Sequence, residues 1–186
     1  MVNLTTVESD PEAAASFLRS LKFDKQTIHE EQPAEEEETN WFDISSEEVK
    51  EKLGKKTIWD EPPVHRGRAF EELRAANLGS NYPTIDDIRI DAGTATSMKT
   101  LNLLTQSYQN VDNVDAMVRS YVDKLSGFTG FNWNGQEYQR GRDFNDLYLE
   151  LGIPNNDVSK EQANKLHELQ GYAQGRNVRL VIVKVP

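Results

Sequence analysis

The sequence predicts an α/β (α+β) fold in which helices flank a mixed sheet, preceded by an acidic, mostly helical N-terminal segment. Some segments carry apolar residues at helical spacing, while others alternate apolar and polar residues as strands do. From residue 66 onward the predicted order is helix, strand, strand, helix, strand, helix, strand. This order is typical of a mixed α/β layer and not of a repeat protein.

The negative charge is concentrated in the first third of the chain. Residues 1–61 hold 16 acidic and 7 basic residues, a net charge of −9, whereas residues 62–186 hold 15 acidic and 14 basic residues, a net charge of −1. Two prolines follow Asp60-Glu61, which is typical of a linker. We therefore expect residues 1–61 to be an acidic N-terminal segment and residues 62–186 to be a separate domain.

Local signals suggest two helices in the N-terminal segment. Asp10-Pro11 matches the start of a capped helix, and residues 24–40 form a self-repelling acidic stretch without regular structure. Ser45 and Glu48 have the spacing of a capping box, and the short helix that they begin should end at Gly54.

The larger domain contains alternating helical and strand patterns. In chain order, we expect a helix over 66–78, a strand over 84–90, a turn at 91–93, a strand over 94–104, a helix over 111–125, a loop or hairpin over 127–141, a strand over 147–154, a helix over 159–174 and a strand over 177–185. Gly79 should end the first helix and Pro154 the third strand. Ser159 and Gln162 should form a second capping box.

The amino-acid composition excludes several classes of site and of protein. The chain has no cysteine, which excludes disulfides, zinc ribbons and thiol catalysis. It shows no signal peptide and no apolar run near the roughly 20 residues that span a bilayer, so we expect a protein without a membrane span. The net charge of −10 argues against nucleic-acid binding, but the near-neutral larger domain weakens that objection.

Three predicted elements carry a possible active site. Glu71 lies on the first helix of the larger domain, and Asp86 and Asp87 interrupt an apolar strand. Ser97 and Lys99 lie two apart on the next strand and should share a face. If these strands pair through the turn near Gly93, a carboxylate comes beside Lys99. Carboxylates can hold Mg²⁺ or Mn²⁺, and a lysine can stabilise charge developing on a phosphate, as phosphodiester hydrolysis requires.

These residues resemble a known family. The order Glu71, Asp86, Lys99 across helix, strand and strand resembles the PD-(D/E)XK nucleases. The blocks Gly67-Arg-Ala-Phe-Glu71, Pro83-Thr-Ile-Asp86 and Ala95-Thr-Ser-Met-Lys99-Thr-Leu-Asn look like C-terminal nuclease toxins of bacterial contact-dependent growth inhibition and polymorphic toxin systems.

The resemblance implies a metal-dependent endonuclease, with tRNA favoured over DNA, and a cognate immunity protein that neutralises it. Glu71 and Asp86 would be the metal ligands, with Ser97 and Lys99 completing the catalytic set. Ser97 departs from the family, which usually has an acid two residues before the lysine. The toxin would be delivered from the surface of the producing bacterium and act in the target-cell cytoplasm. Residues 1–61 would serve delivery or act as a linker.

Several alternatives stay open at this stage. Asp87 could replace Asp86 as the ligand, although the family pattern favours Asp86. Arg66 and Arg68, with Lys124 and two loop arginines, could contact phosphates or be solvated charges. The same site could belong to a DNase toxin, or the chain could be a non-catalytic acidic interaction domain. The nuclease hypothesis requires Lys99 to lie beside Asp86 or Asp87 in one cleft.

Overall fold

The computed structural model describes residues 41–79 and 82–186, which belong to one compact unit, Asn40–Pro186. The helix expected from Pro11 and the acidic stretch over 24–40 lie outside the described residues. Among the described helices, none is long and apolar enough to cross a lipid bilayer.

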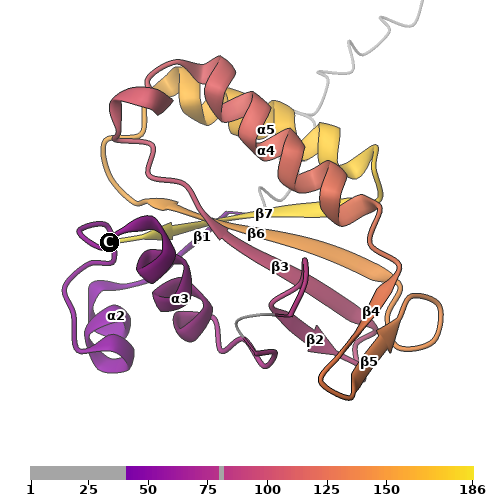
Figure 1. Ribbon diagram of the computed structural model, residues 1–186. Coiled ribbons are helices and arrows are strands. Elements are labelled where there is room, and N and C mark those ends of the chain that lie inside the picture. Colours follow the sequence, from indigo (N-terminus) through magenta and orange to yellow (C-terminus); the bar gives the residue numbers. More distant parts are fainter. Residues whose placement is uncertain (1–40, 80–81) are drawn as a thin grey trace, which may run out of the picture. The chain divides into compact units, whose positions relative to one another are not determined.

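A mixed five-stranded sheet forms the centre of this unit (Figure 1). Its strands, in spatial order, are β1 (Trp41–Asp43), β7 (Val178–Val185), β6 (Asp146–Pro154), β3 (Thr94–Thr100) and β2 (Asp87–Arg89). The first four strands are parallel, and only β2 runs antiparallel, joined to β3 by the turn at Gly93. A separate hairpin pairs β4 (Gly130–Trp133) with β5 (Gln136–Gln139). The predicted mixed sheet with flanking helices is therefore confirmed.

Helices cover both faces of the sheet, as Figure 1 shows. The helices α4 (Val111–Ser126) and α5 (Lys160–Gln174) lie on one face, and α2 (Ser46–Leu53) and α3 (Pro63–Leu73) lie on the other. A short 3-10 helix, η1 (Gln106–Tyr108), precedes α4. Each face has its own apolar core, because alternate strand residues point to opposite sides. On β6, Leu147, Leu149 and Leu151 pack in the core beneath α4 and α5.

The compact unit begins about twenty residues before the expected boundary at residue 62. Trp41 and Phe42 pair in parallel with Ile182 and Val183 of β7. The next residues, 44–61, include Ile44, Val49 and Ile58, which are buried in the same core as Phe70 of α3. The few apolar side chains in this stretch decide its packing, and they contribute nothing to a count of charges.

Caps define the ends of two helices as expected. The Ser45 hydroxyl accepts a hydrogen bond from the Glu48 amide (3.1 Å), and Gly54 ends α2 with a left-handed φ of 66°. Ser159 and Gln162 form the complete, reciprocal capping box of α5. These helix ends could be predicted from the sequence because capping depends on residues within one helical turn.

The helix α3 and its following strand differ from the expected limits. The helix starts at Pro63 and ends at Leu73, five residues before the expected end. Ala75 adopts a left-handed φ of 53°, which turns the chain toward β2. The strand β2 is only three residues long, since Thr84, with a φ of 74°, lies in a turn before it. The strand β3 ends at Thr100, four residues short of the expected 104.

Candidate active site

A cleft of about 410 Å³ opens where β2 ends and leaves the edge of β3 uncovered. The strand β2 pairs with β3 only at Thr94–Thr96, so the rest of β3 has no strand neighbour on that side. Residues of α3 from its first turn to Glu71, near its C-terminal end, line one wall of the cleft. Residues 98–100 of β3 and Tyr121 of α4 line the remainder.

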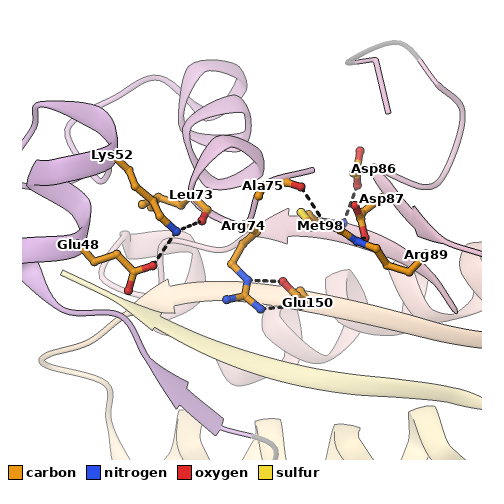
Figure 2. A network of polar contacts seen from close by, with 10 residues as sticks. All are labelled: Glu48, Lys52, Leu73, Arg74, Ala75, Asp86, Asp87, Arg89, Met98 and Glu150. Carbon is orange, nitrogen blue, oxygen red and sulfur yellow. Dashed lines mark hydrogen bonds and ion pairs between the residues drawn. The ribbon is translucent and has the colours of Figure 1, made fainter. Parts of the chain in front are cut away.

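The Asp86 carboxylate takes the place of the missing strand. The Asp86 amide donates to the Thr96 carbonyl (2.8 Å). The Asp86 Oδ2 atom accepts from the Met98 amide (2.6 Å), a contact drawn in Figure 2. A main-chain N–H at a partly buried edge needs a partner, and this side chain supplies it. The position of Asp86 is therefore fixed by the hydrogen bonding of the sheet itself.

Lys99 lies directly beside this carboxylate. Its Nζ atom donates to the Asp86 Oδ2 atom (2.9 Å) and to the Met98 carbonyl (2.7 Å). The Lys99 side chain is 32% exposed, which leaves it accessible from the cleft. An ammonium has three protons to donate, so one remains for a group in the cleft.

Glu71 brings a second negative charge to the same place. Burial raises the pKa of Glu71, and the nearby Asp86 charge raises it further, while Lys99 and Arg68 lower it. Glu71 lines the cleft, whereas Asp86 is not among the lining residues and lies behind Lys99. Two partly buried carboxylates that repel each other are stabilised when a cation binds between them. Glu71 and Asp86 thus meet a first requirement for a metal site.

The donor atoms at this site suit a hard cation. Within the described residues, no three His, Asp or Glu side chains gather closely enough to hold a metal by side chains alone. Glu71 and Asp86 would therefore need further ligands. The Met98 carbonyl has a second lone pair beside its bond to Lys99, and water could complete the set. Oxygen ligands of this kind suit Mg²⁺ or Mn²⁺.

The two other candidate residues have different surroundings. Ser97 is only 3% exposed and is not among the described residues that line the cleft, so its catalytic role stays a prediction. Asp87 accepts a hydrogen bond from the Arg89 Nε atom (2.9 Å), while its buried Oδ1 atom has no partner among the described residues. Of the Asp86-Asp87 pair, Asp86 is the one that contacts Lys99.

The segment after α3 supports β2 from its outer side. The Asn77 amide group bonds the main chain of Ile88 at both its N–H (2.9 Å) and its carbonyl (2.6 Å). The Leu78 amide donates to the Asp86 carbonyl (3.1 Å), and Arg89 donates to the Ala75 carbonyl (3.1 Å). These contacts hold β2 and the residue just before it, Asp86, in place.

An ion pair ties α3 to the middle of the sheet. The Arg74 guanidinium binds the Glu150 carboxylate of β6 through two hydrogen bonds of 2.6 and 2.9 Å (Figure 2). The two side chains are 31% and 15% exposed. This pair was not expected from the sequence, although an acidic residue such as Glu150 within an otherwise apolar strand is a signal that it needs a buried partner.

Two further residues at the cleft were not recognised from the sequence. Tyr121 lies at helical spacing with Val118 and Val122 of α4, yet it lines the cleft. Thr100 accepts a hydrogen bond from the Arg66 Nε atom (3.3 Å) and lines the cleft as well. A hydroxyl on an otherwise aliphatic helix face was the only available signal for Tyr121.

Comparison with known proteins identifies a solved structure with a similar fold. The chain is similar to a solved structure, the CdiA-CT/CdiI toxin and immunity complex from Yersinia pseudotuberculosis, with a TM-score of 0.54 and 16% sequence identity. The match covers 63% of this chain and 98% of that one, and at this identity it shows the fold alone. No curated protein matches the chain.

A family model provides the assignment. The CDI toxin restriction endonuclease-like domain matches residues 66–183, well over half of the chain, and this range includes Glu71, Asp86 and Lys99. The chain therefore belongs to the family of CDI toxin restriction endonuclease-like domains and is a nuclease toxin of this type.

Proposed function

We propose that this domain is a Mg²⁺- or Mn²⁺-dependent endonuclease that hydrolyses phosphodiester bonds in tRNA, with Glu71 and Asp86 as metal ligands. The observation that carries the proposal is the contact between Lys99 and Asp86 at the edge of a cleft that Glu71 also lines. A structural lysine–aspartate pair would not require a second carboxylate whose pKa is raised beside it.

The metal, when bound, would polarise the phosphate and lower the pKa of a coordinated water. Lys99 is held by Asp86 and the Met98 carbonyl, so its remaining proton can orient the attacking water or stabilise charge on the phosphate oxygens. In the hydrolysis, the water oxygen bonds to phosphorus, the phosphorus–oxygen ester bond breaks, and the leaving oxygen gains a proton. Ser97, buried on β3 two residues before Lys99, would support the position of Lys99.

The toxin assignment also suggests a partner and a route. The similar Yersinia structure is a complex of a toxin with its immunity protein, and by the same logic this chain would be neutralised by a cognate immunity protein. It would be delivered from the producing bacterium and act in the cytoplasm of the target cell. Residues 1–40 and the start of the compact unit would connect it to the delivery machinery.

The test is cleavage of total tRNA and of plasmid DNA by the full chain, with Mg²⁺, with Mn²⁺ or with EDTA. We expect metal-dependent cutting of tRNA. Lys99→Met should lower the cutting rate by at least about 100-fold, since it removes the positive charge at the phosphate. Lys50→Met, at an exposed lysine of α2, is the matched control and should cut normally.

Each part of the proposal has its own contrary result. Cutting in EDTA, or cutting unchanged by Lys99→Met while Lys50→Met behaves normally, would remove the metal–lysine mechanism. Cutting of DNA with tRNA left intact would show a DNase toxin that uses the same site. Circular dichroism of each variant shows whether a loss of cutting reflects a loss of fold.

A further inference from the structure

Arg66 occupies an unusual position among the arginines of the domain. It lies in the N-terminal half of α3 and lines the same cleft as Glu71 and Lys99. Its guanidinium stacks over the Trp59 ring, 5.4 Å from the centroid, and its Nε atom donates to the Thr100 hydroxyl (3.3 Å). One face and one edge of the guanidinium are thus fixed, and its terminal N–H groups remain to bind something in the cleft.

No carboxylate among the described residues forms an ion pair with Arg66. By contrast, Arg74 pairs with Glu150 and Arg89 pairs with Asp87. Burial lowers the pKa of Arg66, and the nearby Tyr108 and Tyr121 oppose this effect. A partly desolvated guanidinium without an acid is stabilised by an anion that arrives from outside.

The surroundings of Arg66 are suited to a phosphate. Tyr121 lines the cleft from α4, and burial raises its pKa, so the phenol keeps its proton and can donate to an oxyanion. Pro63 and Val64, in the first turn of α3, also line the cleft, and that turn contains no acidic residue. The positive end of the helix dipole adds to the charge of Arg66.

We propose that Arg66 and Tyr121 form a second phosphate subsite, which binds a backbone phosphate of the nucleic acid next to the phosphate that is cut. The proposal rests on the proposed function, since the two subsites share one cleft and one strand of nucleic acid. Arg66 would hold the flanking phosphate through its two terminal nitrogens, while Thr100 and Trp59 hold the guanidinium in place. Arg66 is then a substrate-positioning residue that acts at a different phosphate from Lys99.

Binding of labelled oligonucleotides by the full chain in EDTA tests the subsite without cleavage. Arg66→Met should weaken binding roughly 10- to 100-fold at low salt, the loss expected for charge-assisted hydrogen bonds to a phosphate. The slope of log Kd against log salt concentration should fall by about one. Arg66→Lys should keep most of the slope and lose part of the affinity, because it retains the charge without the planar fork.

Arg179→Met is the matched control. Arg179 also stacks on an aromatic ring, that of Tyr148 at 5.3 Å, but it is exposed on β7 and does not line the cleft. Its variant should bind as the unaltered chain does. An RNA hairpin and a DNA duplex are tested in parallel, so that the source of the phosphate is identified by the probe whose affinity falls.

A single uncharged methylphosphonate, moved along the oligonucleotide, locates the contact. One position beside the cut bond should weaken binding to the unaltered chain and have no further effect on Arg66→Met. Equal effects at every position in both proteins, or normal binding by Arg66→Met with both probes, would overturn the subsite.

The outcomes for the two proposals are separable. Normal oligonucleotide binding by Arg66→Met in a chain whose cutting depends on metal and Lys99 overturns the subsite and leaves the proposed function. If Arg66→Met lowers the affinity but the unaltered chain never cuts with metal, the proposed function fails and the phosphate subsite stands. If the chain cuts in EDTA, initial cutting rates at limiting substrate replace the binding measurement, and the same losses are expected.

Discussion

Replacing Gly152 by alanine would test how closely α3 packs onto the sheet. Gly152 lies on β6, where it pairs with Thr100 on one side and Val183 on the other. A Cβ atom at this position would lie 2.9, 3.1 and 3.2 Å from three ring carbons of Phe70. Phe70 is fully buried on α3 and cannot move without disturbing the core around it.

The expected loss of stability follows from this contact. Adding a methyl group to a well-packed core costs about 1–3 kcal/mol. For a protein of this size, each kcal/mol lowers the melting temperature by about 2–4 °C, so Gly152→Ala should melt roughly 2–12 °C lower. Glu71 follows Phe70 in the chain, so a displaced ring also moves Glu71 relative to Asp86. Cutting well below the melting temperature should therefore decrease as well.

Thermal unfolding by circular dichroism measures the effect, and Gly171→Ala provides the matched control. Gly171 lies within α5 with no atom within 4 Å of an added Cβ, so alanine there should stabilise by about 0.5–1 kcal/mol. Phe70→Leu in the Gly152→Ala background should recover part of the loss, because the smaller side chain makes room. If Gly152→Ala melts at or above the temperature of the unaltered chain, the close packing described for α3 is refuted.

Glu71→Gln should raise the melting temperature near neutral pH without metal, since the raised pKa means that ionised Glu71 destabilises the fold there. A pH series checks the sign: the gain should vanish as the pH falls through that pKa, and a gain that persists in acid contradicts it. Arg74→Met should lower the free energy of unfolding, measured with denaturant, by about 3 kcal/mol, because it leaves the Glu150 charge buried without a partner. Adding Glu150→Leu should restore most of this loss. A double variant no more stable than Arg74→Met would argue against a stabilising Arg74–Glu150 pair. Asn77→Ala should cost about 1–3 kcal/mol through its two lost bonds to Ile88, and should raise the Mn²⁺ concentration needed for half-maximal cutting; an unchanged melting temperature would show that these bonds do not hold the strand.

The parts of the fold that could be predicted are those fixed by neighbouring residues. Ser45 and Gly54 define α2, and Ser159 defines the start of α5, through contacts within one or two turns. The turn at Gly93, with its φ of 67°, joins β2 to β3 as the sequence suggested. Each of these signals lies within a few positions of the structure that it produces.

The parts that could not be predicted depend on distant contacts. The strand β1 has only three residues and forms because Trp41 pairs with Ile182, far along the chain. The early end of α3 depends on Ala75 and Asn77, whose hydrogen-bond partners lie on β2. A short strand and an unwound helix end have no periodic pattern of their own.

The candidate site shows the same division. The sequence could order Glu71, Asp86 and Lys99 along adjacent elements, and the structure places Asp86 against Lys99. The sequence alone could not show that the Asp86 carboxylate substitutes for a strand or that Arg66 reaches Thr100. Both contacts depend on where β2 ends.

The pairing of β1 with β7 sets the shortest fragment that can fold as this unit. A fragment that begins at residue 62 would lack Ile44, Val49 and Ile58, which cover Val183 and Val185 in the core beneath α2 and α3. It would also expose the outer edge of β7, and a bare edge strand pairs readily with other chains and aggregates. Fragments made for crystallisation or toxicity assays should therefore start upstream of Trp41, even though the match to the family starts at residue 66.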